Sequence, residues 1–380
     1  MKIAIVTLIG EFNYGNLLQS YALQSVLEQM GHNVVILNRR EPKPSLKLLT
    51  IRIMSIFKSI IRRYILGNKE FLIVNPLAED YCVKNRVDCY KLKDFAANYL
   101  NRTLPIRSLC EMRKYIQNEH FDAYIVGSDQ VWREDYTFSI EEMFLSFLHD
   151  GCTAKRIAYA ASFGTDDKPI SSEKLYVCSK LLKQFNAVSV REKSAVGICK
   201  KMFGVESVHL LDPTMLLNID KYKNIFKKAN TPKASGTLLT YILDEDENIK
   251  IKIGKFAKEQ NLIPFSVNVI EKSGSISYTY CKPSIEAWLR GFYDAEFIIT
   301  DSFHACVFSI IFNKPFICLG NKWRGNTRFD SLLHMFGLQD RLVDDMDVNP
   351  ILYRTIDWEK VNEVLEQKRK ESIDFLRIAL

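Results

Sequence analysis

The fold is decided at the start of the chain, where residues 2–37 read KIAIVTLIGEFNYGNLLQSYALQSVLEQMGHNVVIL. The apolar run Lys2–Ile9 predicts a β-strand, and Asn16–Met30 predicts a helix because its apolar residues recur at spacings of three and four. Gly31 then marks the end of the helix, and Val34–Leu37 predicts a second strand. A strand, a helix and a strand in this order form a βαβ unit, the repeating element of parallel sheets covered by helices.

The same alternation of short apolar runs and amphipathic stretches continues along the chain. Further strands are expected at 123–126, 156–163, 187–190, 208–211, 237–243, 262–267, 297–300 and 315–319. Helices are expected at 171–184, from 192, at 247–258, 284–293, 302–312 and 326–336, and from 358. We therefore predict an α/β fold of two Rossmann-like domains, since 380 residues are too many for one ordinary core.

The domain boundaries follow from changes in this pattern. We predict an N-terminal α/β domain over residues 1–217, a C-terminal α/β domain over 218–350, and a C-terminal helix over 351–380 that could pack back on the N-terminal domain. The polar, lysine-rich residues 218–235 are expected to connect the two domains. Two successive α/β domains predict a cleft between them, and ligands of open α/β sheets bind beyond the carboxyl ends of the strands.

A basic helical insertion at about 41–120 interrupts the N-terminal domain. Within it, Pro42 and Pro44 precede the amphipathic stretch Leu46–Leu66. The cations of this stretch are Lys47, Arg52, Lys58, Arg62 and Arg63. One interpretation is a helix at a membrane surface that meets anionic lipid headgroups. The alternative is an ordinary helical insertion with a solvated basic face.

The composition limits the class of protein and its compartment. A hydrophobic content of 47% and a charged content of 26% are those of a soluble globular protein. The net charge of +7 suits anionic small molecules or an anionic membrane better than nucleic acid. Nine cysteines without a Cys-x-x-Cys pair indicate a reducing compartment and no zinc site. Without a signal peptide or an apolar run of about 20 residues, we expect a cytoplasmic protein that could be peripheral at the inner face of the cell membrane.

The sharpest candidate for chemistry is the segment Asp301-Ser302-Phe303-His304, between an expected strand and an expected helix. Ser302 or Asp301 is expected to cap that helix, so that backbone N–H groups point at the strand ends. His304 then lies in the first turn, where it can give or take a proton beside a bound anion. The alternative is a histidine that only forms local hydrogen bonds.

Arginines at two further strand or helix ends could bind an anionic substrate. Arg191 follows the strand at 187–190, and a guanidinium there can hold a carboxylate or phosphate through two parallel hydrogen bonds. Its alternative role is a salt bridge to Glu192. The residues Asn326, Thr327 and Arg328 open a helix and form a candidate anion site, with charge added by Lys322 and Arg324. The alternative is a basic turn on the surface.

The remaining candidates are small and polar residues near the first strands. Ser128 and Asp129 close the strand at 123–126, and Asp129 could accept protons from sugar hydroxyls. Asn13, Gly15 and Asn16 open the first helix without the spacing of a dinucleotide fingerprint, and the chain has no Walker lysine motif. We therefore expect neither NAD nor ATP, and no metal, since no cluster of metal ligands is present.

Six motifs stand in order along roughly residues 1–341. They are NYGNLLQSYALQ at 13–24, GSDQVW at 127–132, SVRE at 189–192, DPT at 212–214, TDSFH at 300–304 and RGNTRFD at 324–330. No single motif is diagnostic, but the ordered set resembles the polysaccharide pyruvyl transferase family. This resemblance covers nearly the whole chain.

The resemblance implies a fold and a reaction. The fold is that of two-domain GT-B glycosyltransferases, with the active site in the interdomain cleft. The reaction moves a carboxyethylidene group from phosphoenolpyruvate, a co-substrate, to two hydroxyls of a sugar in exopolysaccharide or capsule biosynthesis. The acceptor could be a lipid-linked oligosaccharide, and no further cofactor is implied. The family's acid/base histidine corresponds to His304, and its donor-binding arginine is aligned with Arg191.

One departure from the family concerns the segment before His304. Many members carry Ser-Arg-Leu-His where this chain has Asp301-Ser302-Phe303-His304. This chain therefore lacks the basic residue that those members carry next to the position of Phe303. Binding of the donor's charge would then fall to Arg191, Arg324 or Arg328, or the donor would differ. Two other functions remain open at this point: a GT-B glycosyltransferase that uses a nucleotide-sugar, and a non-catalytic module that binds saccharide at a membrane surface.

Overall fold

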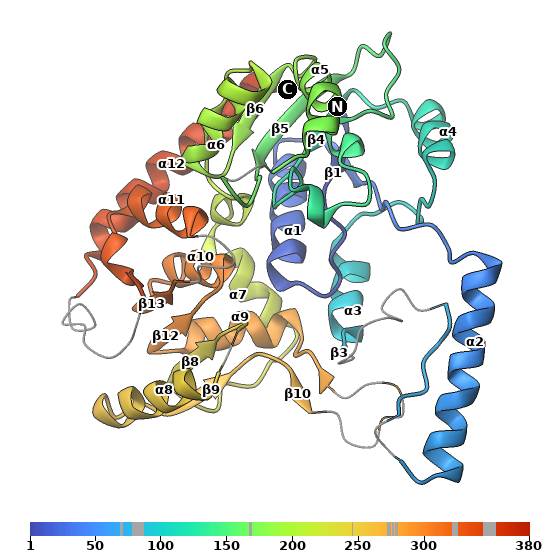
Figure 1. Cartoon of the computed structure of the whole chain (residues 1–380). Coiled ribbons are helices and arrows are strands. Elements are labelled where there is room, and N and C mark those ends of the chain that lie inside the picture. Colours follow the sequence, from blue (N-terminus) through green and yellow to red (C-terminus); the bar gives the residue numbers. More distant parts are fainter. Residues whose placement is uncertain are drawn as a thin grey trace.

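The computed structural model describes residues 1–68, 71–77, 87–166, 169–244, 246–271, 275, 277, 280–320, 326–344 and 355–380. Two parallel sheets, one in each half of the chain, form its framework (Figure 1). The first has the order β2-β1-β4-β5-β6-β7, with strands Asn33–Ile36, Lys2–Val6, Ala123–Val126, Lys155–Ala161, Ala187–Val190 and Val208–His209. The second has the order β14-β13-β12-β8-β9, with strands Leu342–Val343, Phe316–Leu319, Phe297–Thr300, Leu238–Tyr241 and Pro264–Ser266. The predicted α/β class is confirmed.

The opening βαβ unit forms as expected. Helix α1 (Tyr14–Gln29) begins after Asn13, whose side chain accepts a hydrogen bond from the backbone N–H of Asn16, and Gly31 follows its end with a φ of 87°. Strand β1 pairs in parallel with β2 and with β4. Side chains on all sides of α1 are buried, because the helix lies between the two sheets (Figure 1).

A single hydrophobic core joins the two halves of the chain. It combines residues of α1 with residues of α9 (Ile285–Asp294), α10 (Phe303–Ile311) and α11 (Thr327–Phe336). At its centre the Tyr14 ring stacks on the Trp288 ring with a centroid distance of 5.4 Å, and the Tyr14 hydroxyl donates to the Pro283 carbonyl over 2.8 Å. Aromatic burial therefore holds the first turn of α1 against the C-terminal half.

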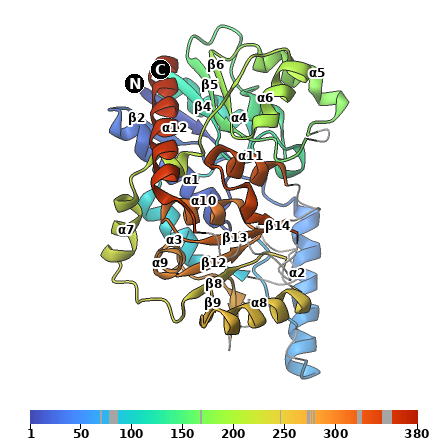
Figure 2. The ribbon, with the colours of Figure 1, turned by 90° about the vertical axis from the view of Figure 1, so that its left-hand side faces the viewer.

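The C-terminal helix α12 (Trp358–Ala379) runs back to the N-terminal sheet (Figure 2). Its Ser372 hydroxyl accepts a hydrogen bond from the backbone N–H of Leu211 over 3.3 Å, and the Lys155 ammonium donates to the carbonyl of Leu380 over 2.5 Å. These contacts place the last helix beside strands of the first half.

The polar segment 218–235 contains a helix that we did not expect. Helix α7 (Ile219–Lys228) buries Tyr222, Ile225 and Phe226 on one face and packs against α9. The three apolar residues follow helical spacing, but the lysines between them on the exposed face dominate the composition.

The remaining helices pack on the sheets or belong to the insertion at 41–120. They are α3 (Tyr90–Tyr99), α4 (Leu109–Glu119), α5 (Ser172–Leu182), α6 (Lys193–Ile198) and α8 (Glu247–Glu259). A small third sheet joins β10 (Ile270–Glu271), β11 (Tyr280–Cys281) and β3 (Val87–Asp88). Helix α2 (Leu46–Ile60), extended by a π-helical turn over Ile61–Ile65, stands at the edge of the molecule without a single buried residue (Figure 1). No helix in the described part of the chain is both long and apolar enough to cross a membrane.

Candidate active site

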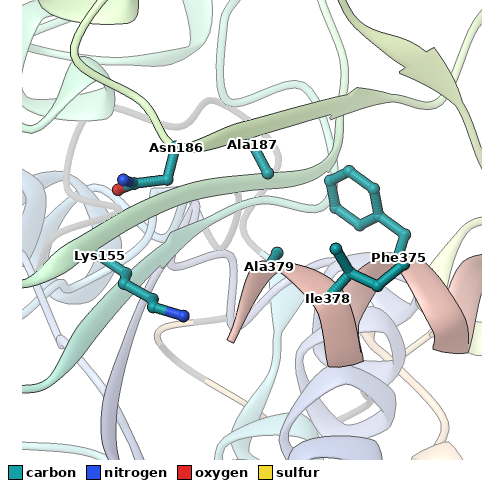
Figure 3. A pocket seen from close by; sticks show the side chains of 6 residues that line it. All are labelled: Lys155, Asn186, Ala187, Phe375, Ile378 and Ala379. Atoms are coloured by element: carbon teal, nitrogen blue, oxygen red, sulfur yellow. The ribbon is translucent and has the colours of Figure 1, made fainter.

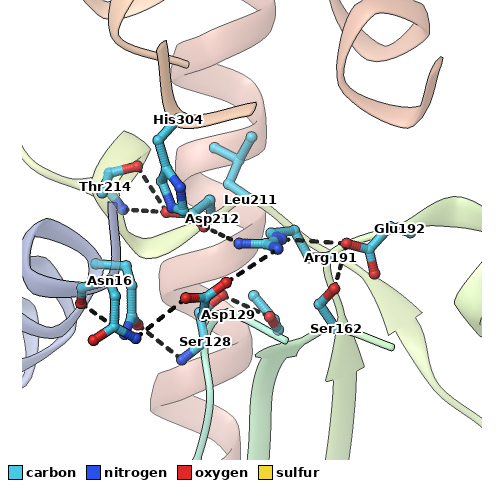
Figure 4. Close-up of polar contacts among 12 residues, drawn as sticks. Asn16, Ser128, Asp129, Ser162, Arg191, Glu192, Leu211, Asp212, Thr214 and His304 are labelled. Carbon is cyan, nitrogen blue, oxygen red and sulfur yellow. Dashed lines mark hydrogen bonds and ion pairs between the residues drawn. The ribbon is translucent and has the colours of Figure 1, made fainter. Parts of the chain in front are cut away.

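Polar side chains from four consecutive strands of the first sheet meet at one edge (Figure 4). Asp129 follows β4, Ser162 follows β5, Arg191 follows β6, and Asp212 lies beyond β7. Because these strands are parallel, their carboxyl ends share that edge, which is where α/β sheets bind ligands. His304 reaches the same cluster from the second sheet, in the first turn of α10 directly after β12.

Arg191 is the centre of the cluster, with a side chain that is only 1% exposed. Its Nη1 lies 2.9 Å from Asp212 Oδ2, its Nε lies 3.3 Å from Glu192 Oε1, and its Nη2 lies 3.6 Å from Asp129 Oδ1. Burial alone would lower the pKa of Arg191, but the three carboxylates raise it. The pairing with Glu192 that we considered as an alternative is present, so this guanidinium holds three carboxylates in place.

Phe303 covers the guanidinium from the other half of the chain. The Cζ of Arg191 lies 4.4 Å from the centroid of the Phe303 ring. A cation over an aromatic face is stabilised electrostatically, and the ring also shields Arg191 from solvent. The residue at which the chain departs from the family pattern is thus a packing partner of Arg191.

Asp212 connects Arg191 to His304 and was missing from our predicted site. Its Oδ1 accepts hydrogen bonds from the backbone N–H and the hydroxyl of Thr214 over 3.0 and 2.7 Å, and its Oδ2 lies 3.5 Å from His304 Nε2. Burial works to raise the pKa of Asp212, but His304 and Arg191 hold it well below its usual range. Asp212 is therefore an ionised carboxylate beside the imidazole. In the sequence, Asp212 directly follows the strand expected at 208–211, and this position at a strand end could have identified it as a site residue.

Gly15 supports His304 from the opposite side. A Cβ added at Gly15 would overlap the imidazole at Nδ1, so the backbone of α1 approaches the ring as only glycine allows. The His304 side chain remains 12% exposed, while its Nε2, on the side of Asp212, is shielded from solvent. The imidazole is thus held between a helix backbone of the N-terminal half and the Asp212 carboxylate.

Asn16 and Asp129 form the part of the cluster nearest to the first helix. The Asn16 amide donates to Asp129 Oδ2 over 3.2 Å, and its oxygen accepts from the backbone N–H of Gly10 over 2.9 Å. Asp129 has a positive φ of 68°, a conformation that Asp adopts more readily than most residues. With an 11% exposed side chain, Asp129 is, like His304, one of the more accessible groups of the cluster.

Two other predicted residues have local structural contacts. Ser128 is fully buried, and its hydroxyl donates to the carbonyl of Ala160 over 2.7 Å. Asn13 is exposed and caps α1. These contacts hold the chain around Asp129 and Asn16 in place.

The predicted side-chain cap of α10 is wrong. Ser302 occupies the N-cap position with extended backbone angles, but its hydroxyl forms no capping hydrogen bond. The Asp301 carboxylate instead accepts hydrogen bonds from the backbone N–H groups of Leu243 and Asp244 over 2.8 and 3.1 Å. Asp301 thus stabilises the turn after β8.

The start of α11 contributes a second arginine close to the cluster. Arg328 lies in the first turn, after Asn326 at the N-cap position and Thr327, whose hydroxyl bonds Asp166 Oδ2 over 2.9 Å. Within the described part of the chain, the Nε of Arg328 is shielded from solvent and has no hydrogen-bond partner. Burial lowers the pKa of Arg328, and the charge of Arg191 lowers it further. A half-buried cation with a shielded nitrogen of this kind is stabilised by an anionic ligand. Arg324 and Lys322 lie outside the described residues.

A pocket at the opposite edge of the first sheet differs from this cluster (Figure 3). It lies at the amino ends of β5 and β6 and is lined by Lys155, Asn186, Ala187, Phe375, Ile378 and Ala379. The Lys155 ammonium already donates to Leu380. Among the described residues, no group of three or more His, Cys, Asp or Glu side chains could hold a metal ion.

Comparisons with known proteins agree with the fold and with the family resemblance. The family model described as "Polysaccharide pyruvyl transferase" matches residues 13–322. No curated protein sequence matches the chain significantly. The UDP-GlcNAc 2-epimerase from Methanocaldococcus jannaschii is similar in structure, with 12% identity, a TM-score of 0.51 and coverage of 96% of this chain and 92% of that chain. The UDP-GlcNAc 2-epimerase from Neisseria meningitidis, bound to UDP-GlcNAc, has 10% identity, a TM-score of 0.50 and coverage of 98% and 94%. Identities this low show the fold alone, and the expected two-domain GT-B arrangement is confirmed.

Proposed function

The chain belongs to the polysaccharide pyruvyl transferase family, and from this premise we propose that it transfers a carboxyethylidene group from phosphoenolpyruvate to two hydroxyls of one sugar. Membership makes the protein a transferase that acts on a sugar or polysaccharide. The observation that carries the finer proposal is the cluster at the carboxyl ends of β4 to β7. There the imidazole of His304, which is 12% exposed, lies 3.5 Å from the ionised carboxylate of Asp212, which in turn pairs with the buried Arg191.

Arg328 is the residue that we propose for binding the donor's negative charge. Arg191 already faces three carboxylates, whereas the buried Nε of Arg328 has no hydrogen-bond partner among the described residues. The carboxylate or phosphate of phosphoenolpyruvate would supply that partner, supported by the N-terminus of α11 at Asn326 and Thr327. Arg191 then acts through Asp129 and Asp212, whose positions it fixes.

His304 is the residue that we propose for proton transfer. A proton passes from the imidazole to the enol methylene of phosphoenolpyruvate, which becomes a methyl group and leaves C2 electrophilic. One sugar hydroxyl adds to C2 and gives up its proton, and Asp129 is placed to accept it. The second hydroxyl then adds to C2, the bond from C2 to the phosphate oxygen breaks, and phosphate leaves with the proton of that second hydroxyl. The proton held by Asp129 returns to His304 through solvent, which restores both groups.

Asp212 is a positioning residue in this scheme. Its carboxylate stabilises the imidazolium form of His304, and Gly15 keeps the ring in place from the other side. General acid–base transfer contributes about 10²–10⁴-fold to a rate, and orientation in a shielded site adds more.

The test is incubation of the purified chain with phosphoenolpyruvate and a panel of sugars, including galactosides and N-acetylmannosaminides. We expect phosphate release together with a sugar whose mass has grown by one pyruvate less one water. In parallel, the shift in melting temperature is measured with phosphoenolpyruvate and with a nucleoside diphosphate. A shift with the nucleotide alone, and no ketal product, would point to a nucleotide-sugar transferase instead.

The matched variants are His304→Ala and His334→Ala. His334 is an exposed histidine of α11, outside the cluster. We expect loss of turnover for His304→Ala and normal turnover for His334→Ala. Full turnover by His304→Ala would remove the proposed acid/base role.

A further inference from the structure

Helix α2 presents an apolar stripe to solvent. Leu46, Phe57 and Tyr64 are 84%, 63% and 65% exposed, and Ile53 and Ile61 between them are also exposed. These positions recur at intervals of seven, four, four and three residues, so they lie along one side of the helix. Large apolar side chains that are exposed in a row indicate an interaction surface.

The side of α2 next to the stripe attaches the helix to the molecule. Leu49, Ile56 and Ile60 are half-buried there. Arg52 and Arg63 donate to the carbonyls of Pro76 and Phe71, each over 3.0 Å. These contacts hold one side of the helix against the protein and leave the stripe beside it open to solvent. Helix α2 stands at the edge of the molecule in both views (Figures 1 and 2).

The charge around the stripe has one sign. Residues 42–68 contain six lysines or arginines and no acidic residue. Lys47, Lys58 and Arg62 are exposed and flank the stripe on its outer side. A second copy of α2 would bring like charges together, and an apolar stripe has no counterpart in a nucleic acid. An apolar stripe with a cationic border instead matches the interface of a bilayer that contains anionic lipids.

We propose that α2 docks the protein on an anionic lipid bilayer, with Leu46, Ile53, Phe57, Ile61 and Tyr64 among the acyl chains and the lysines at the headgroups. This inference does not rest on the proposed reaction, because α2 contributes no residue to the cluster around His304. It places the enzyme where a lipid-anchored acceptor would be found.

The test measures binding of the full chain to vesicles by flotation, using neutral phosphatidylcholine with and without anionic phosphatidylglycerol. We expect wild type to float only with the anionic vesicles and to be released by high salt. Replacing Lys47, Lys58 and Arg62 by Gln should weaken binding about 100-fold, since each cation near an anionic surface contributes about fivefold. A Phe57→Ser/Ile61→Ser variant should bind at least 10-fold more weakly, because two apolar anchors are lost.

The matched control replaces Lys221, Lys227 and Lys228 of α7, which are exposed and outside α2, by Gln. Its binding should stay within about threefold of wild type, and all variants should release phosphate normally with a water-soluble acceptor. Equal losses for the two triple variants, or no binding of wild type to anionic vesicles, would overturn the proposal. The oligomeric state is measured by light scattering. If wild type is a dimer and the Phe57→Ser/Ile61→Ser variant is a monomer, the stripe is an interface between two copies and the proposal is overturned.

Discussion

Replacement of Asp212 by Asn tests the electrostatic argument for the site most directly. The substitution keeps the size of the side chain but removes a negative charge that lies 2.9 Å from Arg191 Nη1 and 3.5 Å from His304 Nε2. The amide oxygen can still accept the two hydrogen bonds from Thr214, so the local backbone should keep its shape.

The size of the effect follows from these distances. A unit charge pair 3.5 Å apart interacts by about 5 kcal/mol at an effective dielectric constant of about 20, which is a ceiling for the stabilisation of the imidazolium. Only part of this interaction is lost when the proton leaves the ring, so we expect a loss of about 2–4 kcal/mol, or about 30- to 1,000-fold in kcat. Arg191 loses one of its three carboxylates, and the free energy of unfolding should fall by about 3 kcal/mol.

The assay is phosphate release from phosphoenolpyruvate with the acceptor identified by the sugar panel. We expect kcat to fall while KM for phosphoenolpyruvate changes little, because Asp212 does not bind the donor in this scheme. A purely structural role would not separate kcat from KM in this way. The matched control is Asp220→Asn, which removes an exposed carboxylate of α7 and should leave both constants unchanged.

A result that contradicts this reasoning is also clear. If Asp212→Asn is folded by circular dichroism and retains kcat within about threefold of wild type, the carboxylate does not stabilise His304 during turnover. If instead KM rises and kcat is unchanged, Asp212 belongs to donor binding, and the proposed division of roles between Arg191 and Arg328 is wrong.

Three further predictions follow from single contacts. Gly15→Ala should lower kcat by about 100-fold, because the added Cβ displaces the His304 ring. The control is Gly254→Ala on α8, where an added Cβ meets no atom within 4 Å. It should leave kcat unchanged and raise the free energy of unfolding by about 0.5–1 kcal/mol. Arg328→Met should stabilise the ligand-free protein in denaturant titrations, because it removes a half-buried cation whose Nε has no partner among the described residues. The same variant should raise KM for phosphoenolpyruvate by about 10- to 100-fold, and a lower stability with unchanged KM would contradict the proposed role. Burial lowers the pKa of His209, so the unfolded chain binds a proton below about pH 6.5 that the folded protein excludes. The free energy of unfolding should therefore fall between about pH 7 and pH 5, and His209→Gln should flatten that slope; an unchanged slope would show that other groups cause it.

Most strands could be predicted from the sequence, some of them residue for residue. The expected strands at 123–126, 187–190 and 297–300 coincide with β4, β6 and β12. Each is a short apolar run bounded by polar residues, and such a run has few alternatives to a buried strand in an α/β chain. Helix α7 was missed because the lysines on its exposed face hid a buried face of only three residues.

The candidate site could be predicted only in part. The rule that ligands bind beyond the carboxyl ends of parallel strands drew attention to Asp129, Arg191 and His304, and these three lie in one cluster. The same rule drew attention to Ser128, whose hydroxyl turns inward to Ala160. The direction of a side chain at a strand end depends on backbone angles that residue type does not specify.

The order of residues along the chain was sufficient for the α/β class, the two parallel sheets and the edge at which polar residues gather, because strand and helix signals are local and parallel strands share their ends. Contacts between distant residues required the folded structure: the Gly15 backbone against His304, the Asp212 carboxylate beside the same ring, and Phe303 over Arg191. These contacts arise where the two halves of the chain pack together. Their distances, burial and charges, which set the chemistry of the site, exist only after the shared aromatic core has formed.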